Sequence, residues 1–405
     1  MTGNGPHKKS QDTSEDSNRT VAADAPVTAS VVGSIGEINA QAWDAIANPD
    51  PATYNPFLAH AFLKALEDSG SVGEGTGWHP RHLILEDDEG LAGSMPLYIK
   101  THSQGEYVFD QSWADAYHRA GGRYYPKLQC AVPFTPVPGP RLLVRSTDPK
   151  SHTLTLATAA REVTRRIGAS SLHITFLDEA TWAQLGAIGF LQRTGQQFHF
   201  TNTGYATFDD FLSALSSRKR KAIRKERAQA VEGLTIRHVT GRDITQADWD
   251  AFFAFYMDTG ARKWGRPYLN RAFFSLLGEA MAENCLLIFA EEAGRPVAGA
   301  LNMIGGDCLY GRYWGALENR PFLHFELCYY QAIDVAIDKG LARVEAGAQG
   351  DHKLARGYQP VTTYSAHYIA DPGLARAVAH YLDHEREAIA ELNEDLSAAG
   401  PYRKS

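Results

Sequence analysis

The sequence predicts an α/β protein of two similar tandem domains, each with a mixed, mainly antiparallel sheet flanked by helices. Three pairs of segments match in the same order along the chain: INAQAWDAIA (38–47) with ITQADWDAFF (244–253), HAFLKALEDS (60–69) with RAFFSLLGEA (271–280), and LAGSMPL (91–97) with VAGALNM (297–303). The first and third pairs are each 206 residues apart. Self-similarity at a nearly fixed spacing indicates an internal duplication.

Each half is predicted to contain two helices, a hairpin, an aromatic strand, a helix and a further apolar strand. The hairpin turns are EDDEG (86–90) and EEAGRP (291–296), where glycine suits a tight turn. The predicted aromatic strands are EYVFDQSWADAY (106–117) and CLYGRYWGAL (308–317). Helix-period stretches then lead into the strands SLHITFLD (171–178) and LARVEAG (341–347). The first half also holds an extra segment, YYPKLQCAVPFTPVPGPRLL (124–143).

These patterns divide the chain into a disordered leader (1–33), a first domain (34–203), a basic linking helix (204–233) and a second domain (234–405) that carries the candidate active site. The leader is rich in Ser, Thr, Asp and Asn and lacks the apolar core of a signal peptide. No long apolar run predicts a membrane span. Four cysteines without a paired spacing favour reduced thiols, so we expect a cytoplasmic protein.

The formal net charge of -7 argues against general DNA binding. Serine-hydrolase, nucleotide-phosphate and metalloprotease motifs are absent from the sequence, and no metal site or tightly bound cofactor is expected.

The main candidate site is the loop EAGAQGDHKLARGYQP (345–360), which follows the predicted strand 341–347. Its candidate residues are Glu345, Gln349, Gly350, His352, Lys353 and Arg356. Glu345 or His352 would take a proton from an attacking amine, while Lys353 and Arg356 would hold the donor or stabilise an oxyanion and tune Glu345. Alternatively, Glu345 pairs with Lys353 or Arg356 in a surface loop that serves only stability.

FLHFELCYY (322–330) gives a second candidate set, His324 as base and Tyr329 or Tyr330 as proton donor to a leaving group. A core role for the tyrosines stays open.

The stretch SRKRKAIRKER (217–227) predicts a basic helix. Arg220 and Arg224 are i, i+4 neighbours that would clamp one donor phosphate. A solvated linking helix is the alternative. In FDQSWADAY (109–117), Asp110 and Trp113 would receive an amine, or the segment is half core. The proline-rich stretch after it predicts a rigid cleft wall with Lys127 and Arg141 as its cations.

The element order resembles the GNAT acyltransferase fold and, duplicated, the Fem-type aminoacyltransferases. YYPKL, VPFTPVPGPRLL, SSRKRKAIRKER and EAGAQGDHKLARGYQP...SAHY resemble the FemAB-like family, from about Ser34 to the C-terminus. This resemblance implies a tandem GNAT-like fold and a link to peptidoglycan biosynthesis. Fem-type enzymes carry a lysine before an aromatic and glycine turn that contacts the donor. Lys353 followed by LARGY resembles it, with glycine before the aromatic.

The leading hypothesis is an N-acyltransferase that moves an acyl or aminoacyl group to an amine, with a peptidoglycan precursor as the acceptor that the resemblance implies. The donor is an aminoacyl-tRNA or an acyl-CoA. The glycine-rich loop by which GNAT domains bind coenzyme A is not found in the sequence, which weakens the acyl-CoA alternative. Acetyl- or acyl-CoA transfer to a small amine and a non-catalytic binding module remain the alternatives.

Overall fold

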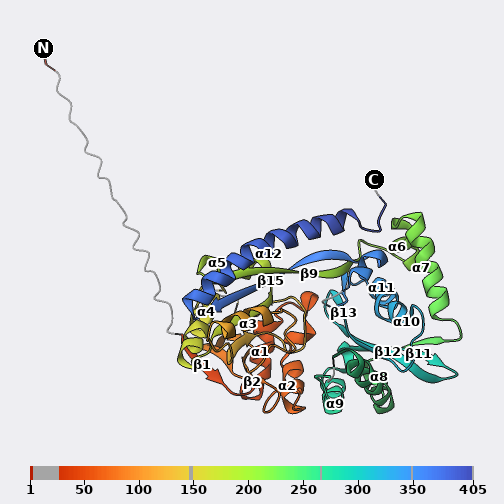
Figure 1. Cartoon of the computed structure of the whole chain (residues 1–405), viewed down its shortest axis with the longest axis horizontal. Coiled ribbons are helices and arrows are strands. Elements are labelled where there is room, and N and C mark those ends of the chain that lie inside the picture. Colours follow the sequence, from red (N-terminus) through yellow and green to blue (C-terminus); the bar gives the residue numbers. More distant parts are fainter. Residues whose placement is uncertain (3–26, 146–148, 265–266, 348–349, 404–405) are drawn as a thin grey trace.

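One sheet runs through both halves of the chain (Figure 1). The computed structural model describes residues 1–2, 27–145, 149–264, 267–347 and 350–403, and there eleven strands join in the order β10-β11-β12-β13-β14-β9-β15-β8-β6-β5-β2. A smaller sheet has the order β1-β3-β4-β7. The strands are β1 (Thr28–Val32), β2 (Trp78–Pro80), β3 (His82–Asp87), β4 (Gly90–Met95), β5 (Leu97–Lys100), β6 (Lys127–Cys130), β7 (Leu143–Val144), β8 (Ser171–Leu177), β9 (Leu191–Thr201), β10 (Thr235–Thr240), β11 (Cys285–Glu292), β12 (Arg295–Ile304), β13 (Cys308–Ala316), β14 (Arg343–Glu345) and β15 (Gln359–Ile369).

Helices flank these sheets. They are α1 (Ala40–Ala47), α2 (His60–Asp68), α3 (Gln111–Arg119), α4 (Pro149–Arg166), α5 (Glu179–Ala187), α6 (Phe208–Ala214), α7 (Ser217–Ala230), α8 (Gln246–Trp264), α9 (Arg271–Ala280), α10 (Leu323–Phe325), α11 (Gln331–Asp338) and α12 (Pro372–Ala398). A π-helix (Glu326–Tyr330) joins α10 to α11, and a 3-10 helix, η7 (Asp351–Arg356), precedes β15. Short 3-10 turns complete the connections.

The predicted duplication is visible as two copies of one element order. The first copy runs α1, α2, the β3–β4 hairpin, β6, α4 and β8; the second runs α8, α9, the β11–β12 hairpin, β13, α11 and β14. In both, the strand before the later helix pairs in parallel with the strand after it, β6 with β8 and β13 with β14. Trp43 and Trp249, matched by the repeat, are both buried. The tandem α/β fold class is confirmed.

The prediction of a strand over 106–117 is wrong. Its second part forms α3, and the strand that corresponds to β13 is β6, which begins at Lys127. Trp113 and Tyr117 lie one helical turn apart, so their aromatic character suits a helix face as well as a strand. The extra segment of the first copy therefore begins near residue 101, before the proline-rich stretch.

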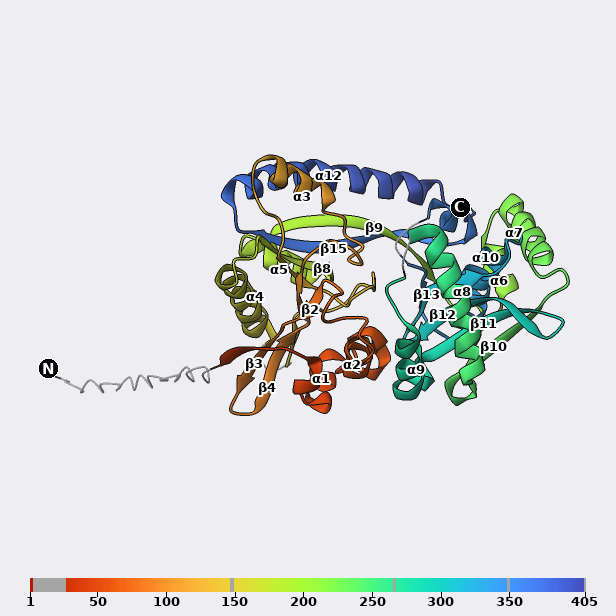
Figure 2. The same ribbon diagram turned by 60° about the horizontal axis from the view of Figure 1, so that its bottom comes forward.

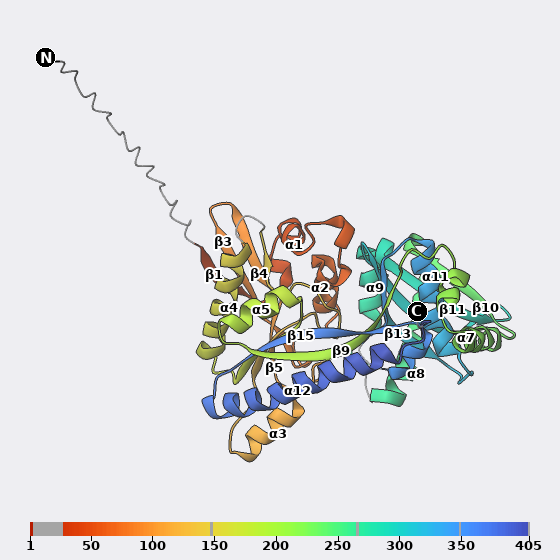
Figure 3. The ribbon, with the colours of Figure 1, turned by 90° about the horizontal axis from the view of Figure 1, so that it is seen from above.

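Each copy uses the last strand of the other copy. β9 follows β8 and α5 in the chain but pairs with β14, while β15 follows β14 but pairs with β8. Between these contacts β9 and β15 pair with each other from Gln359↔His199 to His367↔Leu191. Figures 2 and 3 show these two long strands running side by side between the halves, with α12 along them. The division at residues 203 and 233 stays a prediction, since strands on both sides belong to one sheet.

Ion pairs and amide contacts fix α12 on this strand pair. Arg193 of β9 bonds to both carboxylate oxygens of Glu385, each at 2.7 Å. Gln196 of β9 also donates to Asn393. Within the described residues, no helix has the length and apolar character needed to cross a membrane.

Because β9 and β15 each complete the sheet of the other copy, we expect the two copies to unfold together. Ala366 is buried in β15 and lies between Gln192 of β9 and Ile174 of β8, so proline there removes a ladder hydrogen bond on one side. We expect Ala366→Pro to lower the free energy of unfolding by about 3 kcal/mol or more, measured by urea denaturation followed by circular dichroism. The control, Thr235→Pro, changes the first residue of the edge strand β10 and is expected to cost less. Equal losses in the two variants would contradict the shared core.

Candidate functional site

Three segments that the sequence singled out separately meet on one side of the second copy. They are α7, the α10–π–α11 helix and η7, which contact one another; Figure 1 shows α7, α10 and α11 on the same side as α6. Glu226 of α7 accepts hydrogen bonds from Arg356 of η7 at 2.9 Å and from the Tyr330 hydroxyl at 2.5 Å. Arg227 of α7 forms an ion pair with the buried Glu326 at 2.8 Å. These contacts join residues that are 99 to 130 positions apart in the chain.

Glycines shape both ends of η7. Gly350 precedes it with φ 121° and Gly357 ends it with φ 95°, both in the region that favours glycine. A side chain at Gly357 would lie 2.6 Å from the Phe211 ring, so this turn also packs tightly against α6. Gly350 was predicted to contact a ligand through its backbone; the imidazole of His352 occupies the space beside it. Gln349 lies outside the described residues.

Lys353 is the buried cation of η7. Its side chain is almost fully buried, and Nζ donates a hydrogen bond to the Gly347 carbonyl at 2.8 Å. Burial lowers the pKa of Lys353 from 10.5 to about 8. The Lys353 ammonium therefore loses its proton about one pH unit above neutrality.

His352, Tyr329 and His324 form one cluster beside Lys353. The Tyr329 hydroxyl and His352 Nε2 lie 2.9 Å apart. The His324 ring lies 5.3 Å from the Tyr329 ring and 6.1 Å from the His352 ring, measured between centroids. Burial raises the pKa of Tyr329 well above its ordinary range, so its hydroxyl keeps its proton at neutral pH. The structure thus brings together a histidine and a phenolic donor that were predicted from different segments.

The π-helix contributes to this arrangement. Glu326 is buried at its start and faces Arg227, while Tyr329 and Tyr330 near its end face η7 and α7. One extra residue per turn shifts the side chains relative to a regular helix, and single π turns occur frequently at functional sites. The alternative prediction, that the tyrosines fill the core, is partly correct because both rings are buried.

Arg356 anchors η7. Its guanidinium lies 3.4 Å from the centre of the Phe325 ring, donates to the His352 carbonyl at 2.7 Å and pairs with Glu226. These contacts hold η7 against both α10 and α7. The side chain is 7% exposed.

Glu345 lies apart from the cations that were predicted to tune it. Its Oε1 accepts from Arg343 Nε at 3.2 Å, and Oε2 lies 4.0 Å from His199 Nε2. Side chains alternate along β14, so the neighbouring Val344 packs in the core with Tyr329 while Glu345 faces the other side of the sheet. The predicted pairing of Glu345 with Lys353 or Arg356 is therefore wrong; those two cations bind Gly347 and Glu226 instead.

The proline-rich wall predicted in the first copy lies against the second copy. Arg312 Nη2 donates to the Phe134 carbonyl at 2.7 Å, and Gln197 of β9 donates to the Pro136 carbonyl at 2.7 Å. His199 lies 3.2 Å from Gln197 on the same face as Glu345. Arg141, predicted as a cation of this wall, is 1% exposed and bonds to the wall's own carbonyls. Arg141 therefore stabilises the proline-rich segment from its buried side.

Asp110 and Trp113 lie in a separate buried cluster of the first copy. Asp110 accepts from Lys127 Nζ at 2.5 Å and from the Tyr124 hydroxyl at 2.7 Å. Burial opposes ionisation, but Lys127 and His173 hold the pKa of Asp110 below its usual range. Trp113 packs under Arg193 at 5.0 Å. The charge of Asp110 is thus balanced inside the protein, and neither residue joins the η7 site. Sequence reasoning missed the other members of this cluster: Lys100, Glu106 and His367.

Arg220 and Arg224 of α7 differ in exposure. Arg224 pairs with Asp209 of α6 at 2.8 Å while 55% of its side chain stays exposed, and Arg220 is half-buried. Arg218, Lys221 and Lys225 are exposed on the same helix, whereas Ile223 and Ala230 are buried. The predicted basic helix therefore presents cations to solvent beside the η7 site.

Asn302 of β12 is a residue that sequence reasoning missed. It is fully buried, and among the described residues neither its Oδ1 nor its Nδ2 has a hydrogen-bond partner. A single polar residue inside the apolar run VAGALNMI was the only sequence signal. Buried amides without partners are rare in folded proteins.

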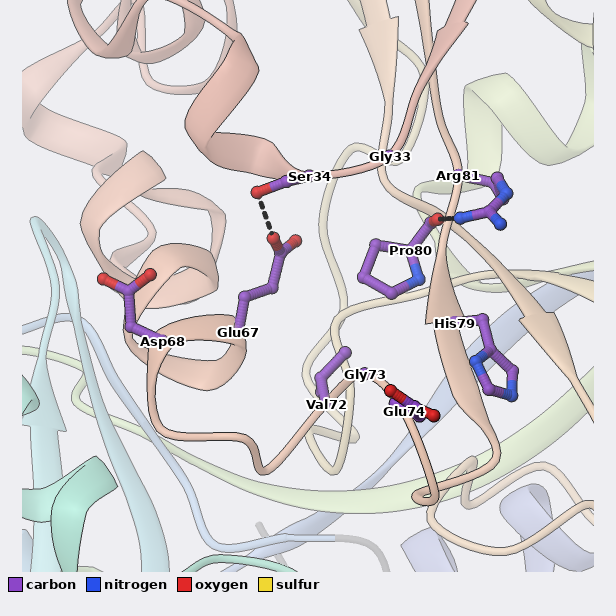
Figure 4. A pocket seen from close by; sticks show the side chains of 10 residues that line it. All are labelled: Gly33, Ser34, Glu67, Asp68, Val72, Gly73, Glu74, His79, Pro80 and Arg81. Atoms are coloured by element: carbon purple, nitrogen blue, oxygen red, sulfur yellow. Dashed lines mark hydrogen bonds between the residues drawn. The ribbon is translucent and has the colours of Figure 1, made fainter.

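Two cavities lie in the first copy, away from η7. One of about 380 Å³ is lined by residues that include Glu67, Glu74 and His79 (Figure 4). Glu67 already accepts hydrogen bonds from Ser34 and His82, so it serves to hold the fold. The other, of about 510 Å³, lies between β1 and α4. No cluster of His, Cys, Asp and Glu suited to a metal ion occurs among the residues that the structure describes.

Comparison with known proteins decides the family. The FemAB-like family, described as peptidoglycan biosynthesis/recognition, matches residues 34–404. The chain belongs to the FemAB-like family. No curated protein matches it.

Solved structures share the fold of this FemAB-like protein. FemX has 14% identity and a TM-score of 0.53, with 84% of this chain and 98% of FemX covered. The C-terminal domain of a protein described as a lysylphosphatidylglycerol synthetase, from Agrobacterium fabrum, has 10% identity and a TM-score of 0.52, with 87% and 97% covered. A conserved protein of Bacteroides thetaiotaomicron has 13% identity and a TM-score of 0.50, with 85% and 98% covered. At these identities the similarity concerns the fold.

The buried Lys353 predicts a specific pH dependence of stability. Its pKa is about 8 in the folded chain against 10.5 ordinarily, so the unfolded chain binds more protons between these values and folding becomes more favourable as pH rises. Lys353→Met removes this penalty. We expect the variant to be more stable than the wild type at pH 7, with an advantage that shrinks by roughly 3 kcal/mol towards pH 10.5. Urea denaturation across this range measures it, with the exposed Lys339→Met as control. An advantage independent of pH would contradict the burial argument.

Proposed function

We propose that this FemAB-like protein is an N-acyltransferase that moves an aminoacyl group from a tRNA ester to an amine. The observation that carries the proposal is the convergence of the basic helix α7, the His352–Tyr329 pair and the buried Lys353 at one place. A phosphate-rich donor needs an exposed cationic surface, and acyl transfer needs a proton acceptor and an electrostatic partner for the carbonyl oxygen.

Each residue has a role in this reaction. The amine attacks the ester carbonyl carbon, which forms the new C–N bond and breaks the C–O bond to the ribose. His352 takes the proton that the amine loses, and Tyr329 gives a proton to the ribose oxygen that leaves. The hydrogen bond between Tyr329 and His352 returns the proton, so the pair ends as it began. Lys353 stabilises the negative charge on the carbonyl oxygen.

Glu345 is less suited than His352 to act as the base. It is buried, accepts a hydrogen bond from Arg343 and faces the proline-rich wall. His352 is exposed and lies on η7 beside Lys353. His324, packed 4.8 Å from the Trp314 ring, positions the Tyr329 ring.

The family description supports a peptidoglycan precursor with a free amine as acceptor. A tRNA donor would place the reaction in the cytoplasm. Purified protein titrated with charged tRNA and, separately, with acetyl-CoA distinguishes the donor classes. Saturable binding of coenzyme A alone would contradict the tRNA donor.

Lys353→Ala tests the proposed oxyanion role. Loss of one such charge partner is expected to slow transfer by roughly 10²- to 10³-fold. The measurement is transfer of a radiolabelled amino acid from total charged tRNA to a soluble peptidoglycan precursor. Lys339→Ala, an exposed lysine at the end of α11, is the control and should retain the wild-type rate. An undiminished rate in Lys353→Ala would exclude Lys353 from the chemistry.

The α7 arginines predict a salt-dependent affinity for tRNA. If Arg220 and Arg224 each contact a phosphate, the double alanine variant should weaken binding and reduce the slope of log K against log[salt] by roughly 1.4 to 1.8. Filter binding from low to moderate salt measures this slope. The control changes Arg165 and Arg166 of α4, exposed arginines of the first copy, to alanine. If both double variants have the wild-type slope, tRNA does not dock on α7.

A further inference from the structure

Asn302 lies where the β13–β14 pair opens. These parallel strands pair from Cys308↔Arg343 to Tyr310↔Glu345. Beyond that point β13 stays paired with β12, whereas the chain after β14 leaves the sheet and enters the η7 loop. Asn302 is opposite Gly311, the first residue of β13 beyond this pairing. A Cβ at Gly311 would lie 3.5 Å from Asn302 Oδ1 and 3.6 Å from the Glu345 carbonyl. The glycine therefore leaves a small gap, of about the size of one methyl group, between the Asn302 amide and the start of the loop; we call it the notch.

Asn302 lies on the face of the sheet that packs against the π-helix and η7. Asn302 is two and four residues from Ala300 and Ala298, so it lies on the same face of β12 as they do. Both alanines belong to the core cluster that contains Tyr329 and Tyr358. The pairing of β12 with β13 is irregular at Leu301 and Asn302, where Arg312 is left without an opposite residue. Bulges of this kind occur often beside active sites, where they redirect a side chain.

The chemistry of the amide defines what it binds. Asn302 offers one acceptor and two N–H donors, fully buried among apolar side chains and without partners in the described chain. Leaving such a group unsatisfied destabilises the fold, so the site is built for a polar partner that arrives from outside. An aminoacyl ester carries an amino group and a carbonyl oxygen on adjacent carbons, which match Oδ1 and Nδ2.

We infer that Asn302 is a specificity-determining residue that distinguishes an aminoacyl donor from a plain acyl donor. Oδ1 accepts a hydrogen bond from the α-amino group, and Nδ2 donates one to the ester carbonyl oxygen. A plain acyl donor has no α-N–H and leaves Oδ1 unsatisfied in an apolar environment. N-acetylation keeps one neutral N–H but removes the charge of the α-amino group and adds a bulky group beside Asn302, so both donors bind more weakly. This inference rests on the proposed transfer from charged tRNA.

Binding of the full chain to three tRNA preparations tests the inference. They are total bacterial tRNA charged with radiolabelled amino acids, the same preparation N-acetylated on its α-amino groups, and uncharged tRNA, each measured by filter binding. The wild type should bind the charged preparation about ten-fold more tightly than the acetylated one. Asn302→Leu should bring this ratio close to one while leaving the affinity for uncharged tRNA unchanged. Asn302→Asp, which keeps the acceptor oxygen, should retain a preference for the free amine.

The control is Gln129→Leu. Gln129 is a fully buried amide of β6, opposite His173 in the corresponding parallel pair of the first copy, and its loss should leave the ratio at the wild-type value. Circular dichroism and melting temperature confirm that each variant folds. A wild-type ratio in Asn302→Leu would overturn the inference and leave the proposed function intact. A wild type that does not prefer charged to uncharged tRNA would overturn the aminoacyl donor itself. A variant that loses only acetyl-CoA binding would show that Asn302 binds an amide of the coenzyme, which also overturns the inference.

Discussion

The antiparallel pairing of β9 with β15 is the constraint on which the rest of the structure depends. Each strand leaves its own copy and completes the sheet of the other, so His199 of β9 lies beside Glu345 of β14 and also beside Gln359 of β15. The η7 loop is the connection between β14 and β15. Its two ends are therefore fixed by the exchange, and the position of Lys353 follows from a contact between the copies rather than from the second copy alone.

Ion pairs away from solvent hold several irregular segments in place, and in them each charge partly offsets the loss of hydration of the other. Arg227 pairs with Glu326, and Arg356 with Glu226, which together attach α7 and η7 to the π-helix. In the first copy Lys127 plays the same part for the segment before β6. Breaking one member leaves the other charge buried, so these pairs specify the arrangement more than they add stability.

Repeated patterns made the fold predictable, and contacts between distant segments limited what could be said of the site. Three pairs of matching segments in the same order, one of them around Trp43 and Trp249, were sufficient to recognise the duplication. The exchange of strands left no trace in periodicity, since β9 and β15 alternate alike whichever sheet they join. The residues of η7 were predicted as a group, but the side of the sheet that Glu345 faces depends on the register of β14. Asn302 became notable only when its lack of a partner was visible.

The divergence of the two copies argues for the function of η7. In the first copy, α5 connects β8 to β9; Asp178 caps it through the Thr181 amide at 2.8 Å, and Leu185 fills the core. A capped helix with an apolar side chain in the core is an ordinary and stable way to connect two strands. The second copy has instead a short 3-10 helix between two glycines in left-handed conformations, with a lysine whose ammonium is destabilised by burial. A regular helix would suit stability better. A desolvated lysine in one of two equivalent connections supports the proposed ligand role of η7, because the first copy makes the same connection with a regular helix.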